Sequence, residues 1–343
     1  MLQLWIIQRL PLKINLQKLL CKLLLVVGIP FSLVALDSSK AHLSFEPFFS
    51  YQYGKLGEYL YCQESSNSDF EKLSYLEWEE KPLWLYGLKM NASYKHLYLG
   101  VSATSAIPAS CGKMYDSDWM DRNNLGLKTN FSESNNSLHS YIDVSGTFGF
   151  IVFPEAVFRI MPFGEVGFYN VVFKAKGAEC WYGDADSTRL GYDVSWNSPY
   201  AEHFVISKSE TVIEYNHSSF YTFLGCQFMI VPTERLEFDV ALAVSPYSYI
   251  YSVDHHIMRS LKFRDESDSY FKTFKGRLSA YYTINDIITA GLSFGGIYTK
   301  MDLSHSYSYV SSNSGKYNWL SNEKGTSDTQ SFNVTASLRI NVF

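Results

Sequence analysis

Residues 141–152 read Tyr-Ile-Asp-Val-Ser-Gly-Thr-Phe-Gly-Phe-Ile-Val, and this stretch decides the fold class. From Ile142 to Phe150 every second residue is apolar or glycine, and the residues between them are polar or small. The same alternation recurs at 236–244 and 288–294, as expected for strands with one apolar face. Strands of soluble sandwiches are usually about 5–6 residues long, whereas several runs here exceed ten. The pattern therefore favours a transmembrane β-barrel with an apolar outer wall and a polar interior.

The connections between the predicted strands fall into two lengths. Short ones lie at 91–94, 154–156, 232–235 and 283–286, and long polar ones at 62–70, 107–137, 184–200, 254–269 and 307–328. Short periplasmic turns and long extracellular loops are typical of outer-membrane barrels. The sequence therefore predicts an all-β fold, a ten-stranded antiparallel transmembrane β-barrel. Its strands are expected at 42–61, 71–90, 94–106, 138–153, 157–183, 201–231, 236–253, 270–282, 287–306 and 329–343.

The first 41 residues do not share this pattern. A short apolar run at 23–35 follows four basic residues, which are Arg9, Lys13, Lys18 and Lys22. A membrane-spanning helix needs ~20 residues, so we predict that residues 1–41 are a signal peptide, cleaved after Ala35 or Ala41. Residues 42–343 then form one barrel domain in the bacterial outer membrane.

The composition limits the partners of the chain. Its 343 residues are 46% hydrophobic and 17% aromatic, and the formal net charge is −5. So many aromatic residues with so few charges are unusual for a soluble enzyme. Without a basic surplus there is no electrostatic reason to expect nucleic acid as a partner.

Four cysteines lie beyond the predicted signal peptide: Cys62, Cys111, Cys180 and Cys226. No pair has the C-x-x-C spacing of zinc sites or thioredoxin-like motifs. Cys62 and Cys111 fall near predicted extracellular loops, and two states stay open for them. They form a disulfide, as an exported protein can, or they are free buried thiols.

Two short motifs stand at predicted strand ends on the same side of the barrel: Asp116-Ser117-Asp118-Trp119-Met120-Asp121 and Asp254-His255-His256. Either one alone has an ordinary explanation, because aspartate favours turns and a histidine at a strand end is often only solvated. Zinc is disfavoured because adjacent histidines rarely point to the same side of a strand. We expect no metal and no cofactor. On opposite parts of a ten-stranded ring, the motifs can face each other across its mouth.

At these motifs the sequence resembles the omptins, outer-membrane aspartate/histidine endopeptidases of Gram-negative bacteria. The resemblance covers most of 42–343 and is densest from 71 to 134. It implies a ten-stranded barrel whose active groove lies at the extracellular rim and takes peptide or protein substrates. The matching residues are Asp116-x-Asp118-Trp119-Met120-Asp121, Asp254-x-His256, Leu43-Ser44-Phe45, Leu73-Ser74-x-Leu76-x-Trp78, Gly126 and Ser132.

The resemblance also implies catalytic roles for Asp116, Asp118, Asp254 and His256. Asp254 would orient the imidazole of His256 and stabilise its protonated form. His256 would remove a proton from a water held between it and Asp116, and this water would attack the peptide carbonyl. Asp118 would share a proton with Asp116 or position the water, because neighbouring carboxylates do not both ionise easily. Ser132 is interpreted as a polar residue of the groove.

Substrate preference follows from the same comparison. Omptins usually prefer a basic residue before the cut bond, held by acidic groups of the groove. Glu58 aligns with one of these acids, whereas Ser252 and Asn130 stand where other acids are expected. We therefore predict cleavage near basic residues, with Glu58 as the substrate-binding residue.

The outer wall departs from the family pattern. Phe168, Asn170 and Val172 stand where lipopolysaccharide-dependent omptins carry Tyr-x-Glu-x-Arg. This difference argues against lipopolysaccharide dependence, although a barrel must contact outer-membrane lipid. We expect a monomer.

Two other functions remain open at this point. The first is a non-enzymatic outer-membrane barrel, either an adhesin or a degenerate omptin, for which the aromatic segment 307–319 would serve as a binding loop. The second is a small-solute channel. Its lumen would contain the inward-facing residues Arg235, Glu237, Asp239 and Arg277.

Overall fold

The computed structural model describes residues 41–63, 69–121, 124–184, 190–300, 302–312 and 315–342. The predicted signal peptide lies outside these ranges, except for Ala41, and stays a prediction. Residues His42–Phe343 form one compact unit. No helix within the described ranges is long and apolar enough to cross a membrane.

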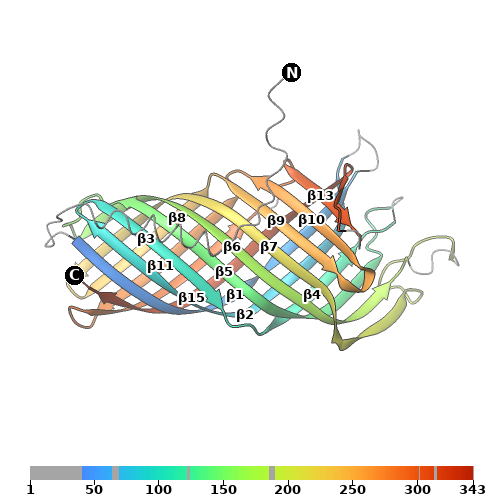
Figure 1. The fold of residues 1–343 in the computed structure, drawn as a ribbon, viewed down its shortest axis with the longest axis horizontal. Coiled ribbons are helices and arrows are strands. Elements are labelled where there is room, and N and C mark those ends of the chain that lie inside the picture. Colours follow the sequence, from blue (N-terminus) through green and yellow to red (C-terminus); the bar gives the residue numbers. More distant parts are fainter. Residues whose placement is uncertain are drawn as a thin grey trace, which may run out of the picture. The chain divides into compact units, whose positions relative to one another are not determined.

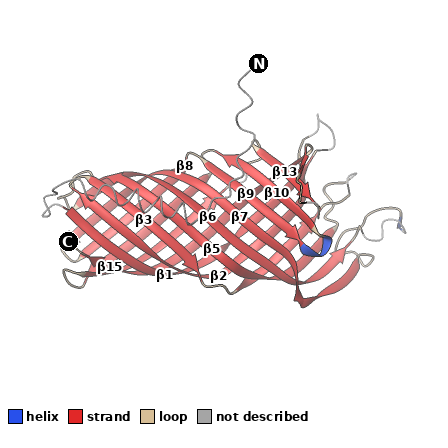
Figure 2. Cartoon of the chain, in the orientation of Figure 1, coloured by secondary structure: helices blue, strands red, loops and turns tan. Residues whose placement is uncertain are grey.

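Strands make up nearly all of this unit, together with the short 3₁₀ helix η3 (Ile257–Arg259) (Figures 1 and 2). Every strand pairing is antiparallel, as the alternating sequence and the short turns predict. The strands are β1 (Ala41–Cys62), β2 (Glu71–Tyr94), β3 (Leu97–Ala106), β4 (Ser110–Asp118), β5 (Asn130–Phe150), β6 (Phe158–Tyr182), β7 (Glu202–Thr233), β8 (Leu236–Ser245), β9 (Ser248–His256), β10 (Leu261–Ser269), β11 (Thr273–Thr283), β12 (Ile288–Thr299), β13 (Ser306–Ser311), β14 (Asn318–Leu320) and β15 (Glu323–Asn341).

The sheet closes into a ring because β8 pairs with both β7 and β11. Around the ring the order is β1, β2, β3, β5, β6, β7, β8, β11, β12 and β15, which returns to β1. Four of the ten barrel strands each consist of two consecutive segments: β3 with β4, β8 with β9, β10 with β11, and β12 with β13. For example, β7 pairs with β9 through Ile213–Tyr221 and with β8 through Leu224–Thr233. The predicted ten-stranded antiparallel barrel is confirmed, with β14 as a short addition beside β13.

Three predicted loops are largely strand. The range 107–137 contains β4 and the start of β5, and the range 254–269 contains the end of β9, η3 and β10. The range 307–328 contains most of β13, all of β14 and the start of β15. These segments gather toward the right-hand end of Figure 1, which we call the rim. Both faces of the barrel wall carry polar residues there, as in β4 and β10. The predicted alternation of apolar and polar residues is lost for this reason.

The lower wall carries the apolar belt. Large apolar side chains such as Phe148, Leu242 and Phe332 point outward and are 55–58% exposed. Their neighbours along each strand point into the lumen, as a period of two requires. This outward apolar surface is the part of the wall that would contact lipid.

Buried rings fill the barrel between the belt and the rim. Trp78 stacks on Phe173 with ring centroids 5.9 Å apart and on Tyr215 at 5.3 Å, and Leu56 is also fully buried. We call these four residues the aromatic plug. The plug forms an apolar core inside an otherwise polar lumen, at the level of the upper strands.

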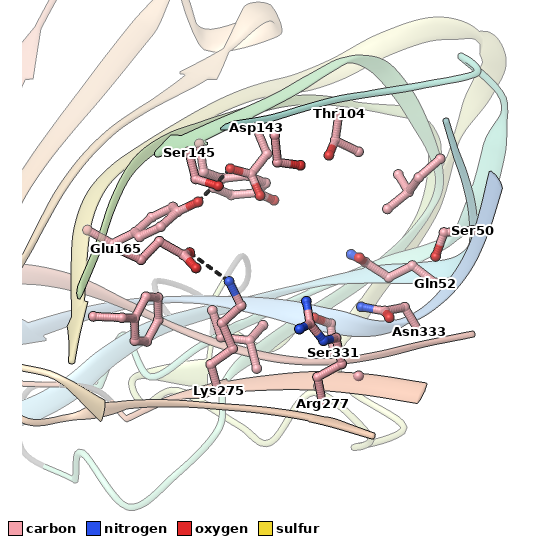
Figure 3. Close-up of a pocket in the computed structure, with 18 of the residues that line it drawn as sticks. Ser50, Gln52, Thr104, Asp143, Ser145, Glu165, Lys275, Arg277, Ser331 and Asn333 are labelled. Atoms are coloured by element: carbon pink, nitrogen blue, oxygen red, sulfur yellow. Dashed lines mark hydrogen bonds and ion pairs between the residues drawn. The ribbon is translucent and has the colours of Figure 1, made fainter. Parts of the chain in front are cut away.

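Below the plug lies a polar cavity of about 300 Å³ (Figure 3). Lys275 donates to Glu165 across it at 2.7 Å, and Tyr221 donates to Asp143 at 2.6 Å. Along β1, Gln52 lines the cavity, the plug residue Leu56 follows, and Glu58 comes after it. The plug therefore lies between the cavity and the rim.

The cysteines settle one open alternative. Cys111 and Cys180 are free thiols and are both buried, so Cys111 forms no disulfide with Cys62. Cys226 is also a free thiol.

Candidate active site

The end of β4 holds the first motif. In the sheet, β4 lies between β2 and β5, so that Asp116 is opposite Leu76 on one side and Ser132 on the other. Asp116 is buried, and Asp118 is half-buried at the last position of the strand. The backbone carbonyl of Asp118 accepts a hydrogen bond from the backbone N–H of Thr129 at 2.9 Å. This bond fixes the strand end from which both carboxylates project.

The end of β9 holds the second motif. Asp254 and His256 alternate with outward-facing residues and are both buried on the inner side of the wall. His256 Nε2 lies 2.6 Å from Asp254 Oδ2. The ring of Phe263, from β10, meets the imidazole edge-on with centroids 5.4 Å apart. The imidazole is thus held on one edge by a carboxylate and on one face by a phenyl ring.

The short helix η3 brings a further residue to this imidazole. Arg259 is its last residue, and its guanidinium Nη2 donates a hydrogen bond to His256 Nδ1. Arginine has no acceptor atoms, so Nδ1 is the acceptor in this bond. His256 therefore carries its proton on Nε2, which donates to Asp254.

The two motifs meet at the same end of the barrel. Burial raises the pKa of Asp116 well above its usual value, and the charges of Asp118 and Asp254 raise it further. Burial also raises the pKa of Asp118, while the nearby Arg259 and His256 lower it. The acidic and imidazole groups at the ends of β4 and β9 are therefore close enough to interact electrostatically.

Two more buried carboxylates complete what we call the acid cluster: Glu58 on β1 and Asp265 on β10, with Asp116 and Asp254. Glu58 and Asp265 are each 6% exposed. Burial raises the pKa of Glu58 well above its usual value, and the charges of Asp254, Asp265 and Asp116 raise it further. Burial raises the pKa of Asp265 to about 7, although a hydrogen bond from Ser308 opposes this shift.

The remaining predicted residues fall into two groups. Ser132 and Ser252 are buried on the inner wall beside the motifs, and Asn130 lies opposite Asp118. Asn170 is on β6, where its amide donates to Asn216 at 2.7 Å. The site at the rim thus includes the first group and leaves Asn170 outside it.

Sequence reasoning missed Arg259 and Asp265. Both lie in the range 254–269, which was predicted to be a loop, so no face could be assigned to either residue. The pattern of β10 offers little signal, because outward-facing Glu266 is as polar as inward-facing Asp265. A strand pairing between β9 and β10 would have been needed to find Asp265.

Comparison with known proteins identifies the family to which the chain belongs. The family model described as the Omptin family matches residues 43–342. The chain belongs to the Omptin family. By sequence, no curated protein matches this omptin chain.

Among solved structures, the outer membrane protease OmpT from Escherichia coli is similar to this omptin. The TM-score is 0.75 at 15% identity, over 88% of this chain and 96% of that one. The translocator domain of the autotransporter NalP from Neisseria meningitidis aligns with a TM-score of 0.30, at 10% identity and over 93% of this chain and 95% of that one. The barrel fold is therefore that of OmpT.

Proposed function

We propose that this chain is an endopeptidase of the bacterial outer membrane that hydrolyses peptide bonds at the extracellular rim with an activated water. One observation carries the proposal. The hydrogen-bonded pair Asp254–His256 lies at the same end of the barrel as Asp116 and Asp118, within electrostatic range of both. Family membership and the OmpT-like fold support the same activity.

His256 acts as the general base in this proposal. Asp254 accepts the Nε2 proton, so Nδ1 is the nitrogen that takes a proton from water. When Nδ1 becomes protonated, the buried carboxylate of Asp254 stabilises the imidazolium. The water attacks the carbonyl carbon directly and forms a tetrahedral intermediate. The C–N bond of this intermediate then breaks as the imidazolium of His256 gives its proton to the leaving amine, so no covalent intermediate with the enzyme forms.

Asp116 and Asp118 hold the water on its other side. Burial and mutual repulsion raise the pKa of Asp116, so the pair retains a proton more readily than an isolated carboxyl group would. A carboxyl pair sharing one proton can accept a hydrogen bond from water and donate one to the carbonyl oxygen. This arrangement needs no metal.

Arg259 must move for the base to act. Its guanidinium now donates to Nδ1, which is the nitrogen that the water requires. The carboxylates of Asp116 and Asp118 are its alternative partners, because Arg259 already lowers the pKa of both. The exposed position of Arg259 on η3 leaves its side chain free to change partners when substrate binds.

Glu58 directs the cut toward basic residues. It is buried in the acid cluster, where burial and the neighbouring acids raise its pKa, and a bound cation would favour its ionised form. A cationic side chain placed there would form charge-assisted hydrogen bonds. We therefore propose a preference for arginine or lysine before the cut bond.

The test is a peptide-library assay with purified, refolded protein. The variants Asp116→Ala and His256→Ala are compared with Glu133→Gln, which changes an acid on the outer face of β5. We expect cleavage near basic residues that falls by roughly 10²–10⁴ in the first two variants and persists in the control. Equal residual activity in all proteins would refute the peptidase and favour the adhesin.

A specific observation disfavours the channel. The aromatic plug fills the barrel between the cavity and the rim, and its rings are fully buried. We expect no steady conductance in a planar bilayer. A stable, ohmic pore with the unmodified protein would contradict this expectation.

A further inference from the structure

We infer that Asp265 and Glu58 together form a carboxylate pair that binds the cationic side chain of the substrate residue before the cut bond. This inference rests on the proposed peptidase function and extends it to a specificity residue on β10. The acid expected at position 252 is a serine in this chain. Asp265, on the neighbouring strand β10, supplies the carboxylate instead.

The strand register places Asp265 beside position 252. In the antiparallel pair β9–β10, Ser252 lies directly opposite Asp265. Directly opposite residues point to the same side of a sheet, with Cβ atoms about 5 Å apart. Both side chains are buried on the inner wall. A carboxylate at 265 therefore reaches the region that a carboxylate at 252 would have occupied.

The neighbouring strand β15 brings Asp265 toward Glu58. A Cβ atom added to Gly325 would lie 2.0 Å from the carboxyl carbon of Asp265, so this carboxyl group rests on the bare backbone of Gly325. Ser327, two residues farther along β15, lies opposite Glu58 on β1. The two acids thus approach the same short piece of β15 from opposite sides. Their mutual repulsion contributes to the raised pKa of Glu58.

The pair has an unmet need for hydrogen-bond donors. Glu58 Oε2 is buried and forms no hydrogen bond of ordinary geometry within the described part of the chain, and the indole of Trp78 acts on this carboxyl group only as a single neutral donor. Asp265 accepts a hydrogen bond from Ser308, which is a weak neutral donor. A buried carboxylate oxygen without a donor is unfavourable, and a ligand that supplies donors removes the penalty. A guanidinium has five N–H donors in a plane that suits paired carboxylates.

The surroundings favour a cation over a neutral group. The charged residues that act most strongly on Asp265 are themselves acids, namely Asp254 on β9 and Glu323 on β15. Tyr215 on β7 also interacts with Glu58 and Asp265, and it is neutral near pH 7 because burial raises its pKa. Short serine side chains at 252, 308 and 327 line the register positions next to the acids. The chemistry therefore suits arginine, or lysine with fewer hydrogen bonds.

The experiment compares two peptides that differ only in arginine or citrulline before the cut bond. Citrulline has nearly the same shape as arginine and no charge. The measured quantity is the ratio of kcat/KM for the two peptides. We expect the ratio to fall by about 10–100-fold in Asp265→Asn. The matched control Glu266→Gln, on the outer face of the same strand, should keep the ratio of the unmodified protein.

A relocation variant tests the geometry. Ser252→Asp combined with Asp265→Ser returns the carboxylate to the opposite position on β9, and we expect the arginine preference to survive. Loss of preference in this double variant, or equal losses for both peptides in Asp265→Asn, would overturn the inference. Either result would assign Asp265 a purely structural role.

A binding measurement separates this inference from the proposed function. The two peptides are titrated by calorimetry into His256→Ala and into His256→Ala with Asp265→Asn. Tighter binding of the arginine peptide that depends on Asp265 supports the pocket, even when the unmodified protein cleaves nothing. Cleavage by the unmodified protein with no such dependence refutes the pocket and leaves the peptidase intact.

Discussion

Replacing Asp254 by asparagine gives the sharpest test of the proposed chemistry. Asp254 Oδ2 lies 2.6 Å from His256 Nε2, and the two side chains are 4% and 11% exposed. Opposite unit charges at this distance attract by about 6 kcal/mol at an effective dielectric constant of ~20. The amide of asparagine would retain part of the hydrogen bond, so we expect a net loss of ~3–5 kcal/mol from transition-state stabilisation. The value of kcat should therefore fall by roughly 10²–10⁴.

The same substitution should not weaken the fold. The charge of Asp254 raises the pKa of Glu58, Asp116 and Asp265. A carboxyl group whose pKa is raised by folding contributes stability below its pKa in the unfolded chain. This stability is lost as the pH rises through the pKa of the group in the folded protein. Removing the charge of Asp254 lowers the pKa values of Glu58, Asp116 and Asp265 in the folded protein, so less stability is lost near neutral pH. We therefore expect equal or higher resistance to unfolding.

The assay measures kcat with a fluorogenic peptide and the unfolding temperature of the same detergent-refolded samples. Glu266→Gln is the control for exchanging an acid for its amide. We expect a large fall in kcat for Asp254→Asn with no fall in unfolding temperature. A change in kcat of less than about tenfold would refute the role of the Asp254–His256 pair. A parallel fall in both quantities would show that the residue is structural.

Three further predictions concern the same rim. Arg259→Ala removes a cation that lowers the pKa of Asp116 and Asp118. We therefore expect the acidic limb of the plot of kcat/KM against pH to move up by about one pH unit, because exposure to water limits the effect. An acidic limb at an unchanged pH would contradict this prediction. Gly325→Ala introduces a Cβ atom 2.0 Å from the carboxyl carbon of Asp265, so the arginine-to-citrulline ratio should fall and the protein should lose about 1–3 kcal/mol of stability in denaturant unfolding. Because the pKa of Asp265 is about 7, KM for the arginine peptide should decrease as the pH rises from about 6 to 8, and Asp265→Asn should weaken this dependence, because only Glu58 then titrates in the pocket.

The lower barrel could be predicted from sequence because lipid and lumen impose opposite demands on alternate residues. Phe148 and Leu242 point outward, and their neighbours along the strands point inward, so a period of two is visible in the sequence. At the rim, polar residues occupy both sides of the wall, so the sequence carries no period of two there. The segments β4 and β10 were therefore predicted to be loops, although they continue the barrel.

The site was predictable to the extent that its residues form local motifs. Asp116 and Asp118, or Asp254 and His256, are two residues apart and share the inner side of one strand, so each pair could be recognised within a few positions. Asp265 joins the site through the pairing of β10 with β9 and through contact with β15. Such a contact between distant segments leaves no trace in a single sequence.

The acid cluster gives a physical reason for linking specificity to catalysis in this barrel. Glu58, Asp116, Asp254 and Asp265 are 4–8% exposed, and burial raises the pKa of Glu58, Asp116 and Asp265. Ionising several neighbouring buried carboxylates is unfavourable, so the empty site favours the protonated forms of Glu58, Asp116 and Asp265. A substrate cation beside Glu58 and Asp265 would lower the pKa of these two groups and that of Asp116. Binding of the correct side chain would thus move the carboxyl pair at the water toward the form that shares a single proton, and a neutral side chain in the same place would not.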